Sequence, residues 1–310
     1  MGFKWKKLDN RKILMEKPSV ALLRCRFLRK IRDVDIKKVV FLDETWVNAN
    51  ICKDIGWTDN SIKCTLNSPL GKGKRLIICH AGGYNGWIDA PPLIFQSKKT
   101  VEYHEEMNAE IFEGWFFEVL LKSIPAGSII VMDNAPYHSR VANKAPTSGS
   151  RKAEMVEWLS SRNIMFTPDM RKPELYNLIK LHKSQVTVYE IDKRAVQLGF
   201  KIIRLPPYHC NYNPIELVWA NLKKYVSSRN STFKLSDVQN LFMEAVNSLS
   251  QDDWRRCVNH VKADIDSDWI NEGLDDTSVQ EMIVHLAPGD SDDSEWEIDD
   301  DSDAGVWPLD

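Results

Sequence analysis

The sequence predicts an α/β domain built on a five-stranded sheet. Short runs rich in β-branched and aromatic residues alternate with longer segments whose apolar residues recur at helical spacing. Two of the short runs, "VVFLDETW" and "SIIVMDNAPYH", lead into an aspartate, which places acidic side chains beside a buried sheet. A chain of 310 residues with 43% hydrophobic residues has enough apolar surface to fill such a core.

The strands are expected in the following order. The first covers about 38–44, with Asp43 at its carboxyl end. Two more apolar runs around a Gly-rich turn predict a hairpin near 75–96. The fourth strand ends at Asp133, and the fifth covers about 200–205.

Helices are expected between and around these strands. The basic segment "VALLRCRFLRKIR" and residues 104–123 both have apolar residues at helical spacing. Between strands four and five, the block 143–199 predicts two amphipathic helices around an extended link and a third helix at about 186–198. Asn213 is expected to cap a further helix that runs to about Ser228, with Glu216 in its first turn.

Charge is unevenly distributed along the chain. Residues 1–38 carry 13 basic and 4 acidic side chains, whereas residues 264–310 carry 17 acidic side chains and no basic ones. Residues 1–263 therefore have a net charge of +14. A cationic body of this size favours a polyanionic partner, with nucleic acid as the leading candidate and an evenly solvated surface as the alternative.

These patterns divide the chain into three parts. Residues 1–36 are expected to form a basic linker or arm, and 37–266 the main folded domain, which includes the block 143–199. Residues 267–310 have the composition of an acidic disordered tail, which either competes with DNA for the basic body or serves solubility.

The same composition argues against several classes of protein. No apolar run approaches the roughly 20 residues of a membrane span, and the start of the chain lacks the apolar segment of a signal peptide. The six cysteines form no C-x-x-C pair, so neither a zinc knuckle nor a disulfide framework is predicted. We expect an intracellular protein with reduced thiols, no membrane partner and no organic cofactor.

Three acidic residues are the candidate active site: Asp43, Asp133 and Glu216. If their strands are neighbours, all three meet at one edge of the sheet. Two carboxylates about 4 Å apart repel by roughly 4 kcal/mol at an effective dielectric of 20, so the set needs a cation. Mg²⁺ or Mn²⁺ suits such oxygen ligands, and two ions support in-line displacement at phosphorus. Taken singly, each aspartate could equally be a turn former or a helix cap. Glu216 alone could be an ordinary acid in the first turn of a helix.

Three motifs together resemble a known family. "VVFLDETW", "VMDNAPYH" and "LPPYHCNYNPIELVWANLKKY" are similar to the Asp-Asp-Glu (DDE) transposases of the mariner/Tc superfamily, over about residues 37–230. The resemblance implies a ribonuclease H-like fold, with a mixed five-stranded sheet flanked by helices on both faces. It also implies that Asp43, Asp133 and Glu216 are the metal-binding catalytic acids.

The same resemblance implies an activity and partners. The reaction would be metal-dependent cleavage at transposon ends followed by strand transfer into target DNA, with two Mg²⁺ or Mn²⁺ ions. Double-stranded DNA would be the substrate, and a nuclear homodimer the working form. The residues that would orient phosphate or water beside the acids are Asn134, His138 and His209. For each of them, a purely structural role in a turn is an equal alternative.

The sequence departs from the family pattern in two places. Between Asp133 and Glu216 lie 82 residues, far more than the family's usual spacing, because of the helical insertion at 143–199. Part of this insertion is similar to a SAP-type helix-extended-helix module, which would imply contacts with the DNA backbone; alternatively, its helices cover the sheet. Most of the helix-turn-helix region that precedes the catalytic domain in this family is expected to be missing, "MGFKWKK" being similar to its end.

Two other functions are compatible with parts of the sequence. Haloacid-dehalogenase-type phosphatases also place an aspartate after an apolar strand, but they need a second aspartate two residues later, where this chain has Thr45. The stronger alternative is a truncated or domesticated transposase-derived protein that binds DNA as a scaffold without mobilising it.

Overall fold

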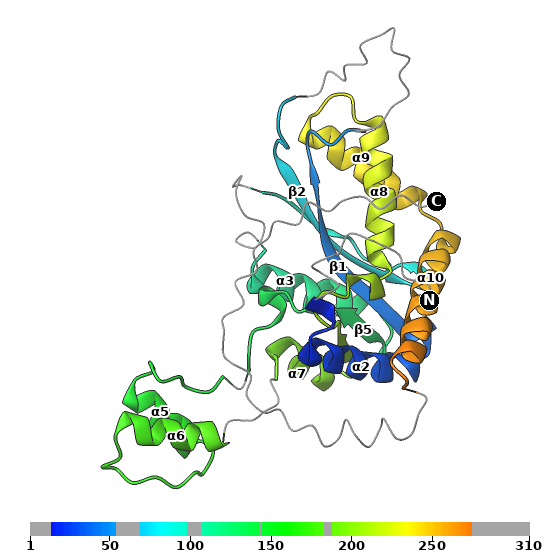
Figure 1. The fold of residues 1–310 in the computed structure, drawn as a ribbon. Helices are drawn as coiled ribbons and strands as arrows, with labels where there is room; N and C mark the ends of the chain where they lie inside the picture. The colour runs from blue at the N-terminus through cyan, green and yellow to red at the C-terminus, as the bar shows by residue number, and fades with distance from the viewer. Residues whose placement is uncertain (1–13, 54–68, 98–106, 143, 183–187, 275–310) are drawn as a thin grey trace, which may run out of the picture.

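A mixed sheet forms the centre of the protein (Figure 1). In the computed structural model, the described residues are 14–53, 69–97, 107–142, 144–182 and 188–274. The strand order is β3-β2-β1-β5-β6, with β4 also paired to β2; β1 is antiparallel to β2 and parallel to β5, which is parallel to β6. The strands are β1 (Val39–Asn48), β2 (Arg75–Gly83), β3 (Gly86–Trp87), β4 (Leu93–Gln96), β5 (Ile129–Met132) and β6 (Lys201–Arg204).

The third predicted strand is divided, so the described sheet has six strands where the sequence predicted five. The predicted hairpin near 75–96 is confirmed, because β3 pairs with the end of β2 and β4 with its start. Pro91 and Pro92 lie between β3 and β4. Proline has no amide hydrogen to donate to a sheet ladder, so the strand is interrupted at this point.

The first strand is longer than predicted. It was expected to end near residue 44, but β1 stays paired with β2 as far as Asn48, which faces Arg75. Asp43 therefore lies in the middle of a strand and not at its end. The expectation for the fourth strand is confirmed, because β5 ends at Met132 and Asp133 follows it directly.

Helices cover both faces of the sheet (Figure 1). One hydrophobic cluster joins a face of the sheet to α2, α8, α9 and α10, and a second joins the opposite face to the α3–η2–α4 segment and α7. The helices of the first layer are α2 (Pro18–Arg32), α8 (Ile215–Arg229), α9 (Leu235–Ser248) and α10 (Gln251–Asn271). Those of the second are α3 (Ala109–Trp115), the π-helical segment η2 (Phe116–Leu120), α4 (Leu121–Ser123) and α7 (Glu190–Gln197).

The two ends of the described chain pack into the first layer. Helix α2 falls in the segment expected as a linker or arm, yet its residues Phe27 and Leu28 lie in the main core. Helix α10 continues past residue 266, and Trp269 and Leu274 are buried, so the beginning of the predicted tail belongs to the domain. An ion pair between the buried Arg24 and the partly buried Glu272 joins the two ends. Residues 1–13 and 275–310 lie outside the described residues.

Two predicted helix starts need correction. The helix expected over 104–123 begins at Ala109, where the Asn108 side chain accepts a hydrogen bond from the backbone amide of Ile111; residues 104–106 lie outside the described residues. Asn213 does not cap α8 with its side chain. Its amide instead donates to the carbonyl of Leu42 at 3.2 Å, which ties the entry to α8 to strand β1.

The insertion forms a separate small lobe, here named the insertion lobe (residues 144–182; Figure 1). It contains α5 (Lys152–Ser160) and α6 (Lys172–His182), joined by a non-helical link as predicted. The two helices share a hydrophobic cluster of their own, built around Trp158, Leu159 and Leu175. Since this cluster is distinct from the two that flank the sheet, α5 and α6 do not serve to cover the sheet.

No helix among the described residues combines the length and apolar character that crossing a membrane requires. The cysteines within the described ranges are free thiols: Cys25, Cys52, Cys79, Cys210 and Cys257.

Candidate active site

Asp43 lies on the face of β1 that is covered by α8. Successive side chains of a strand point to opposite faces, so Asp43 shares a face with Phe41 and Val47, which belong to the first hydrophobic cluster. From α8, the indole nitrogen of Trp219 donates to Oδ2 of Asp43 at 3.2 Å. A carboxylate is thus held inside a mainly apolar layer by one hydrogen bond from a buried side chain.

Asp133 is oriented by two donors on a single oxygen. Its Oδ1 accepts a hydrogen bond from the backbone amide of Ala135 at 3.0 Å and another from Nδ1 of His138 at 2.7 Å. Among the described residues, no donor is bonded to Oδ2 of Asp133. The side chain is 45% exposed, so this second oxygen is the one suited to an external ligand.

His138 joins Asp133 to a carboxylate that sequence reasoning missed. Its Nε2 donates to Oε1 of Glu44 at 3.0 Å, and Oε2 of Glu44 accepts from the Tyr137 hydroxyl at 3.3 Å. His138 and Glu44 have side-chain exposures of 0% and 2%. Because both ring nitrogens are bonded to carboxylates, His138 positions Asp133. The ligand atoms of Glu44, Asp133 and His138 all lie within 4.8 Å of one another.

Glu44 was overlooked because it follows Asp43 directly. Strand alternation turns it to the opposite face of the sheet, toward the second cluster, where it meets η3 (Pro136–His138). The signal was present in the sequence: an ionisable residue within an apolar strand needs a buried partner. His138, in the neighbouring motif "DNAPYH", supplies it.

The pKa values reflect this arrangement. Although burial opposes its charged form, the pKa of His138 is raised to about 9 by Glu44 and Asp133. Burial is the largest single influence on Asp133 and opposes its ionisation, but the hydrogen bonds from His138 and Ala135 and the charges of His138 and Arg204 together outweigh it and lower the pKa of that carboxyl. The pKa of Asp43 is raised well above its ordinary value, first by burial and then by the negative charges of Glu216, Glu44 and Asp133.

Glu216 lies in the first turn of α8 and is exposed, although its neighbours Ile215, Val218 and Trp219 are buried. Its backbone amide donates to the carbonyl of Asn213 at 3.1 Å, so the bond from Asn213 to β1 also fixes the start of the helix. Among the neighbouring charges, that of Glu216 has the largest effect on Asp43. The charges of Glu216 and Asp133 both act on Asp43. Among the described residues, however, the group with ligand atoms all within 4.8 Å of one another is Glu44, Asp133 and His138, and not the three predicted acids.

Two other predicted site residues have structural contacts instead. The side chain of Asn134 donates to the carbonyl of Leu205 at 2.7 Å and links the ends of β5 and β6. His209 is buried between α2 and the segment before α8, with Nδ1 2.7 Å from the carbonyl oxygen of Pro207 and Nε2 3.4 Å from a guanidinium nitrogen of Arg24. The expectation that these residues orient phosphate or water gains no support from their contacts.

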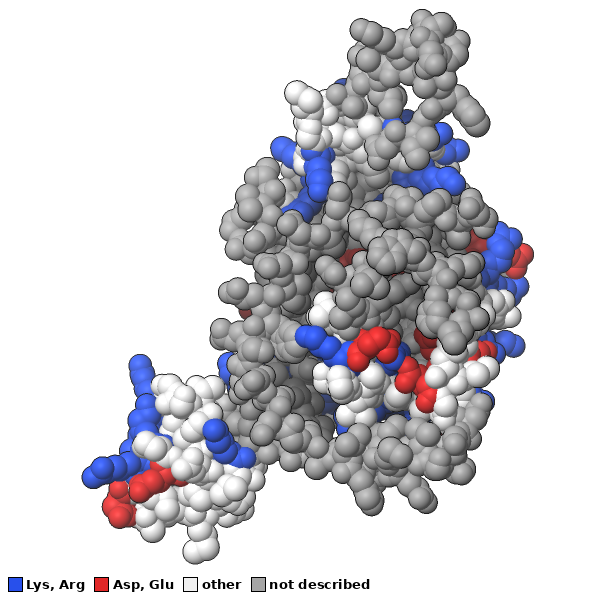
Figure 2. All heavy atoms as spheres, in the orientation of Figure 1, with Lys and Arg blue, Asp and Glu red and all other residues white. Residues whose placement is uncertain are grey.

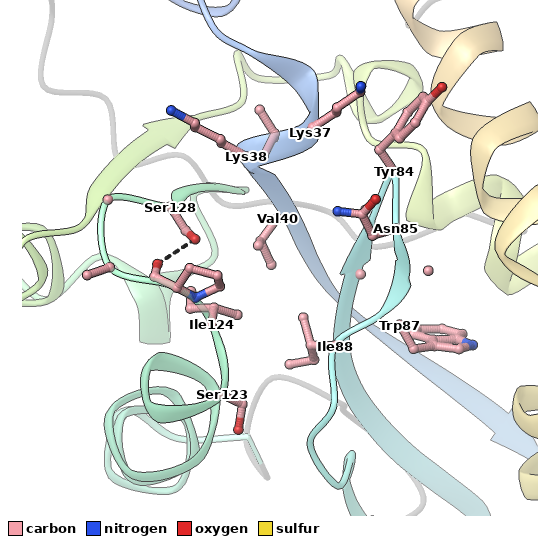
Figure 3. A pocket seen from close by; sticks show the side chains of 17 residues that line it. Lys37, Lys38, Val40, Tyr84, Asn85, Trp87, Ile88, Ser123, Ile124 and Ser128 are labelled. Carbon is pink, nitrogen blue, oxygen red and sulfur yellow. Dashed lines mark hydrogen bonds between the residues drawn. The ribbon is translucent and has the colours of Figure 1, made fainter.

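A cavity of about 310 Å³ lies at the other end of the sheet (Figure 3). Its lining includes the first residues of β1 and Ser128, which precedes β5, with Lys37 and Lys38 at its edge. Asp43 and Asp133 lie further along the same parallel strands. Since the described lining contains no carboxylate, this cavity is distinct from the candidate active site.

Comparison with known proteins identifies related sequences and folds. The sequence model of a family described as DDE superfamily endonuclease matches residues 38–239. Among curated proteins, none matches the chain.

Several solved structures of Mos1 have a similar fold. The Mos1 strand transfer complex has a TM-score of 0.53 and 13% identity, over 88% of this chain and 66% of that one. The Mos1 mariner paired end complexes with Mn and with Mg each have a TM-score of 0.51, at 14% and 16% identity, over 88% of this chain and 68% of theirs. The likeness confirms the predicted ribonuclease H-like α/β fold.

Proposed function

The chain belongs to the family of DDE superfamily endonucleases, and from this membership we propose that it cleaves DNA phosphodiester bonds and transfers the freed strand to target DNA. Asp43, Asp133 and Glu216 are the proposed catalytic acids. One observation carries the proposal: parallel strands β1 and β5 pair Phe41 with Val131, each two residues before a proposed acid, and α8, which carries Glu216, is bonded to Asp43 through Trp219.

The donor set fits Mg²⁺ or Mn²⁺. Both ions prefer oxygen ligands, and the only available donors in this cluster are carboxylate oxygens, since the nitrogens of His138 are already bonded. The raised pKa of Asp43 marks an uncompensated concentration of negative charge, which a divalent cation would relieve. We propose two ions, held by Asp43, Asp133 and Glu216. When bound, they would activate the attacking oxygen and stabilise the leaving one.

The protein's own residues would hold this site in shape. His138, itself fixed by Glu44, holds Oδ1 of Asp133 and leaves Oδ2 for a ligand. Trp219 holds one oxygen of Asp43. Such outer contacts typically change metal affinity or activity by 10–100-fold when removed, because they keep ligand atoms in the required geometry.

Double-stranded DNA is the proposed substrate. The net charge of +14 over residues 1–263 favours a polyanion. The Mos1 structures named above include paired end and strand transfer complexes, which supports DNA as the partner. The same proposal includes a homodimer, which sedimentation in the presence of DNA would test. It also includes action in the nucleus, where genomic DNA lies, which imaging of a tagged chain would test.

The insertion lobe is proposed to contact the DNA backbone. It carries 7 basic and 4 acidic side chains, and Figure 2 shows Lys and Arg side chains projecting from it. Both of its helices begin with an exposed Arg-Lys pair, Arg151–Lys152 and Arg171–Lys172. Replacing all four by glutamine should weaken DNA binding without changing the unfolding temperature of the sheet domain.

Nicking of supercoiled plasmid tests the central proposal. We expect cleavage by the full chain in Mg²⁺ or Mn²⁺, none in EDTA, and none by Asp133→Asn. Asp266→Asn, at an exposed position of α10, is the matched control and should cleave normally. Tight DNA binding without metal-dependent cleavage would instead support the scaffold alternative.

A further inference from the structure

Arg204 lies beside the candidate active site, at the end of β6. In the parallel pair of β5 and β6 it is opposite Met132, the residue before Asp133. Its Nη1 donates to the backbone carbonyl of Asp133 at 3.2 Å, and its Nη2 donates to the backbone carbonyl of His138 at 2.8 Å. One guanidinium therefore spans the loop that carries a proposed metal ligand and the histidine that holds it.

The same guanidinium is held by α7, which follows the insertion lobe in the chain. Its Nε donates to Oδ2 of Asp192 at 3.1 Å, and its Nη2 donates to Oδ1 at 2.7 Å. Its central carbon lies 4.2 Å from the centre of the Tyr189 ring, and Tyr189 forms a β-bridge with Val141. Only 12% of the Arg204 side chain is exposed, so its pair with Asp192 is shielded from solvent more than a surface ion pair is. Arg204 thus connects the segments on both sides of the insertion lobe to the loop after β5.

These contacts determine how firmly the Asp133 carboxylate is held. The hydrogen bond from Nδ1 of His138 fixes Oδ1 of Asp133 only while the backbones of both residues keep their relative positions. Arg204 bonds both backbones at once, so it keeps the two ends of that hydrogen bond at a constant separation. Since Arg204 reaches Asp133 through the backbone carbonyl, it leaves the carboxylate available to a cation.

We propose that Arg204 is a positioning residue for Asp133 and that Asp192 holds Arg204 in that role. This inference rests on the proposed function, in which Asp133 is a ligand of the divalent cation. The planar fork of a guanidinium presents several N–H groups in fixed directions, which suits two carbonyls and a carboxylate together. The ammonium group of a lysine has the same charge without that geometry. Arg204→Lys therefore separates the hydrogen-bond geometry from the positive charge.

Arg140 provides the matched control. It also lies next to the insertion lobe in the chain, and its Nη2 donates to Oε2 of Glu113 on α3 at 2.8 Å. The Arg140 side chain is 56% exposed, and its described partner is on α3 and not in the loop after β5. Arg140→Gln therefore removes an ion pair from the same region without removing a donor to Asp133 or His138.

Mn²⁺ binding and amide hydrogen exchange together test the inference. Calorimetry measures the Mn²⁺ affinity of the full-length proteins, and hydrogen exchange in EDTA follows the bonded loop amides of Ala135 and Ser139. We expect Arg204→Lys to bind Mn²⁺ about tenfold more weakly than the wild type. Its two loop amides should also exchange faster relative to those of the β1–β2 ladder, because the loop opens locally. Arg140→Gln should match the wild type in both measurements.

The outcomes separate this inference from the proposed function. A wild type that binds no Mn²⁺ would overturn the proposed metal site and the inference together. A wild type that binds Mn²⁺, with Arg204→Lys equal to Arg140→Gln in affinity or in loop exchange, would overturn the inference alone. Faster exchange spread equally over the loop and the β1–β2 ladder would do the same, since it indicates a general structural role.

Asp192→Asn keeps the test decisive if Arg204→Lys does not fold. It weakens the support of the guanidinium from α7 and leaves the donors to Asp133 and His138 in place. We expect weaker Mn²⁺ binding and faster loop exchange than in Arg140→Gln, both by smaller factors than full loss of the guanidinium would give. Wild-type values in Asp192→Asn would overturn the inference.

Discussion

The indole nitrogen of Trp219 lies 3.2 Å from Oδ2 of Asp43, so helix α8 holds the central strand through an acid of the candidate active site. Trp219 is 2% exposed and lies three residues after Glu216. One helix therefore carries one proposed metal ligand and fixes another. A displacement of α8 would disturb both acids together.

Replacing Trp219 tests this contact, and Trp254 provides the control. Trp254 is also buried in the aromatic cluster around Trp87, but its indole nitrogen has no hydrogen-bond partner in the described structure. Both tryptophan-to-phenylalanine changes reduce volume, whereas only Trp219→Phe removes a hydrogen bond. We expect Trp219→Phe to lower the free energy of unfolding by about 1 kcal/mol more than Trp254→Phe does.

Metal affinity distinguishes a positioning role from a purely structural one. Trp219→Phe should weaken Mn²⁺ binding, measured by calorimetry, by about tenfold, while Trp254→Phe should leave it near the wild-type value. Equal losses in the two variants would show that the hydrogen bond to Asp43 has no part in shaping the site.

The buried His138 should make stability depend on pH. Its pKa is about 9 in the folded protein against 6.5 ordinarily. A raised pKa stabilises the folded state fully below about pH 6.5, and this contribution is lost as pH rises through about 9. The stability advantage of the wild type over His138→Gln should therefore shrink by up to about 3 kcal/mol across that range.

Urea unfolding in EDTA at a series of pH values provides the measurement. His260→Gln is the control, because His260 is exposed on α10. It shows what the loss of an exposed histidine alone does to the free energy of unfolding. An advantage over His138→Gln that grows with pH would mean that the folded protein holds His138 neutral.

Asp43 should destabilise the metal-free protein at neutral pH. Burial and the nearby acids raise its pKa well above the ordinary value. Its contribution therefore favours folding at low pH and is lost as pH rises through the folded pKa. In EDTA at neutral pH, we expect Asp43→Asn to unfold at a higher temperature than the wild type, because the substitution removes an uncompensated buried charge.

Added Mn²⁺ should reverse that order. The wild type gains stability from binding the ion, whereas Asp43→Asn loses a ligand and gains little. Calorimetry in buffers of different ionisation enthalpy should also show proton release from the wild type on metal binding. If Asp43→Asn is less stable than the wild type in EDTA, the negative charge of Asp43 is already balanced by other groups of the protein.

Sequence reasoning succeeded where one local signal was enough. Asp133 was placed correctly because Pro136 and the turn-forming "DNAP" mark the end of β5. Its failures involve contacts between distant segments. Nothing within "FLDETW" shows that β2 pairs with β1 as far as Asn48, and nothing near Asn213 shows that its amide reaches Leu42.

His138 and His209 illustrate the same limit. Each follows an aromatic or proline-rich turn, and the sequence predicted the same role for both, namely orienting phosphate or water. In the fold, the carboxylates of Glu44 and Asp133 surround His138, whereas His209 faces the guanidinium of Arg24. The charge and role of a buried histidine depend on the side chains that surround it. Those side chains come from residues far away in the chain, so a local motif does not reveal them.

The acidic end of the chain gives a last prediction, on DNA affinity. Residues 275–310 carry 13 acidic side chains and no basic ones. If this segment competes with DNA for the basic body, removing it should raise DNA affinity, most at low salt where charges are least screened. A full-length variant with these acids changed to Asn or Gln should bind equally tightly, because charge and not length is responsible. Unchanged DNA affinity in both variants would mean that the segment does not compete with DNA and instead keeps the protein soluble.

The position of the truncation matters for this test. Removing residues from 265 onward would delete Ile265, Trp269 and Leu274 from the core and would leave the buried Arg24 without its partly buried partner Glu272. Each large apolar side chain lost from a core costs about 2–5 kcal/mol, so that protein should not fold. A chain ending at Leu274 should show the helical circular dichroism and unfolding temperature of the full-length protein. Equal stability of the two truncations would show that the end of α10 adds nothing to the fold.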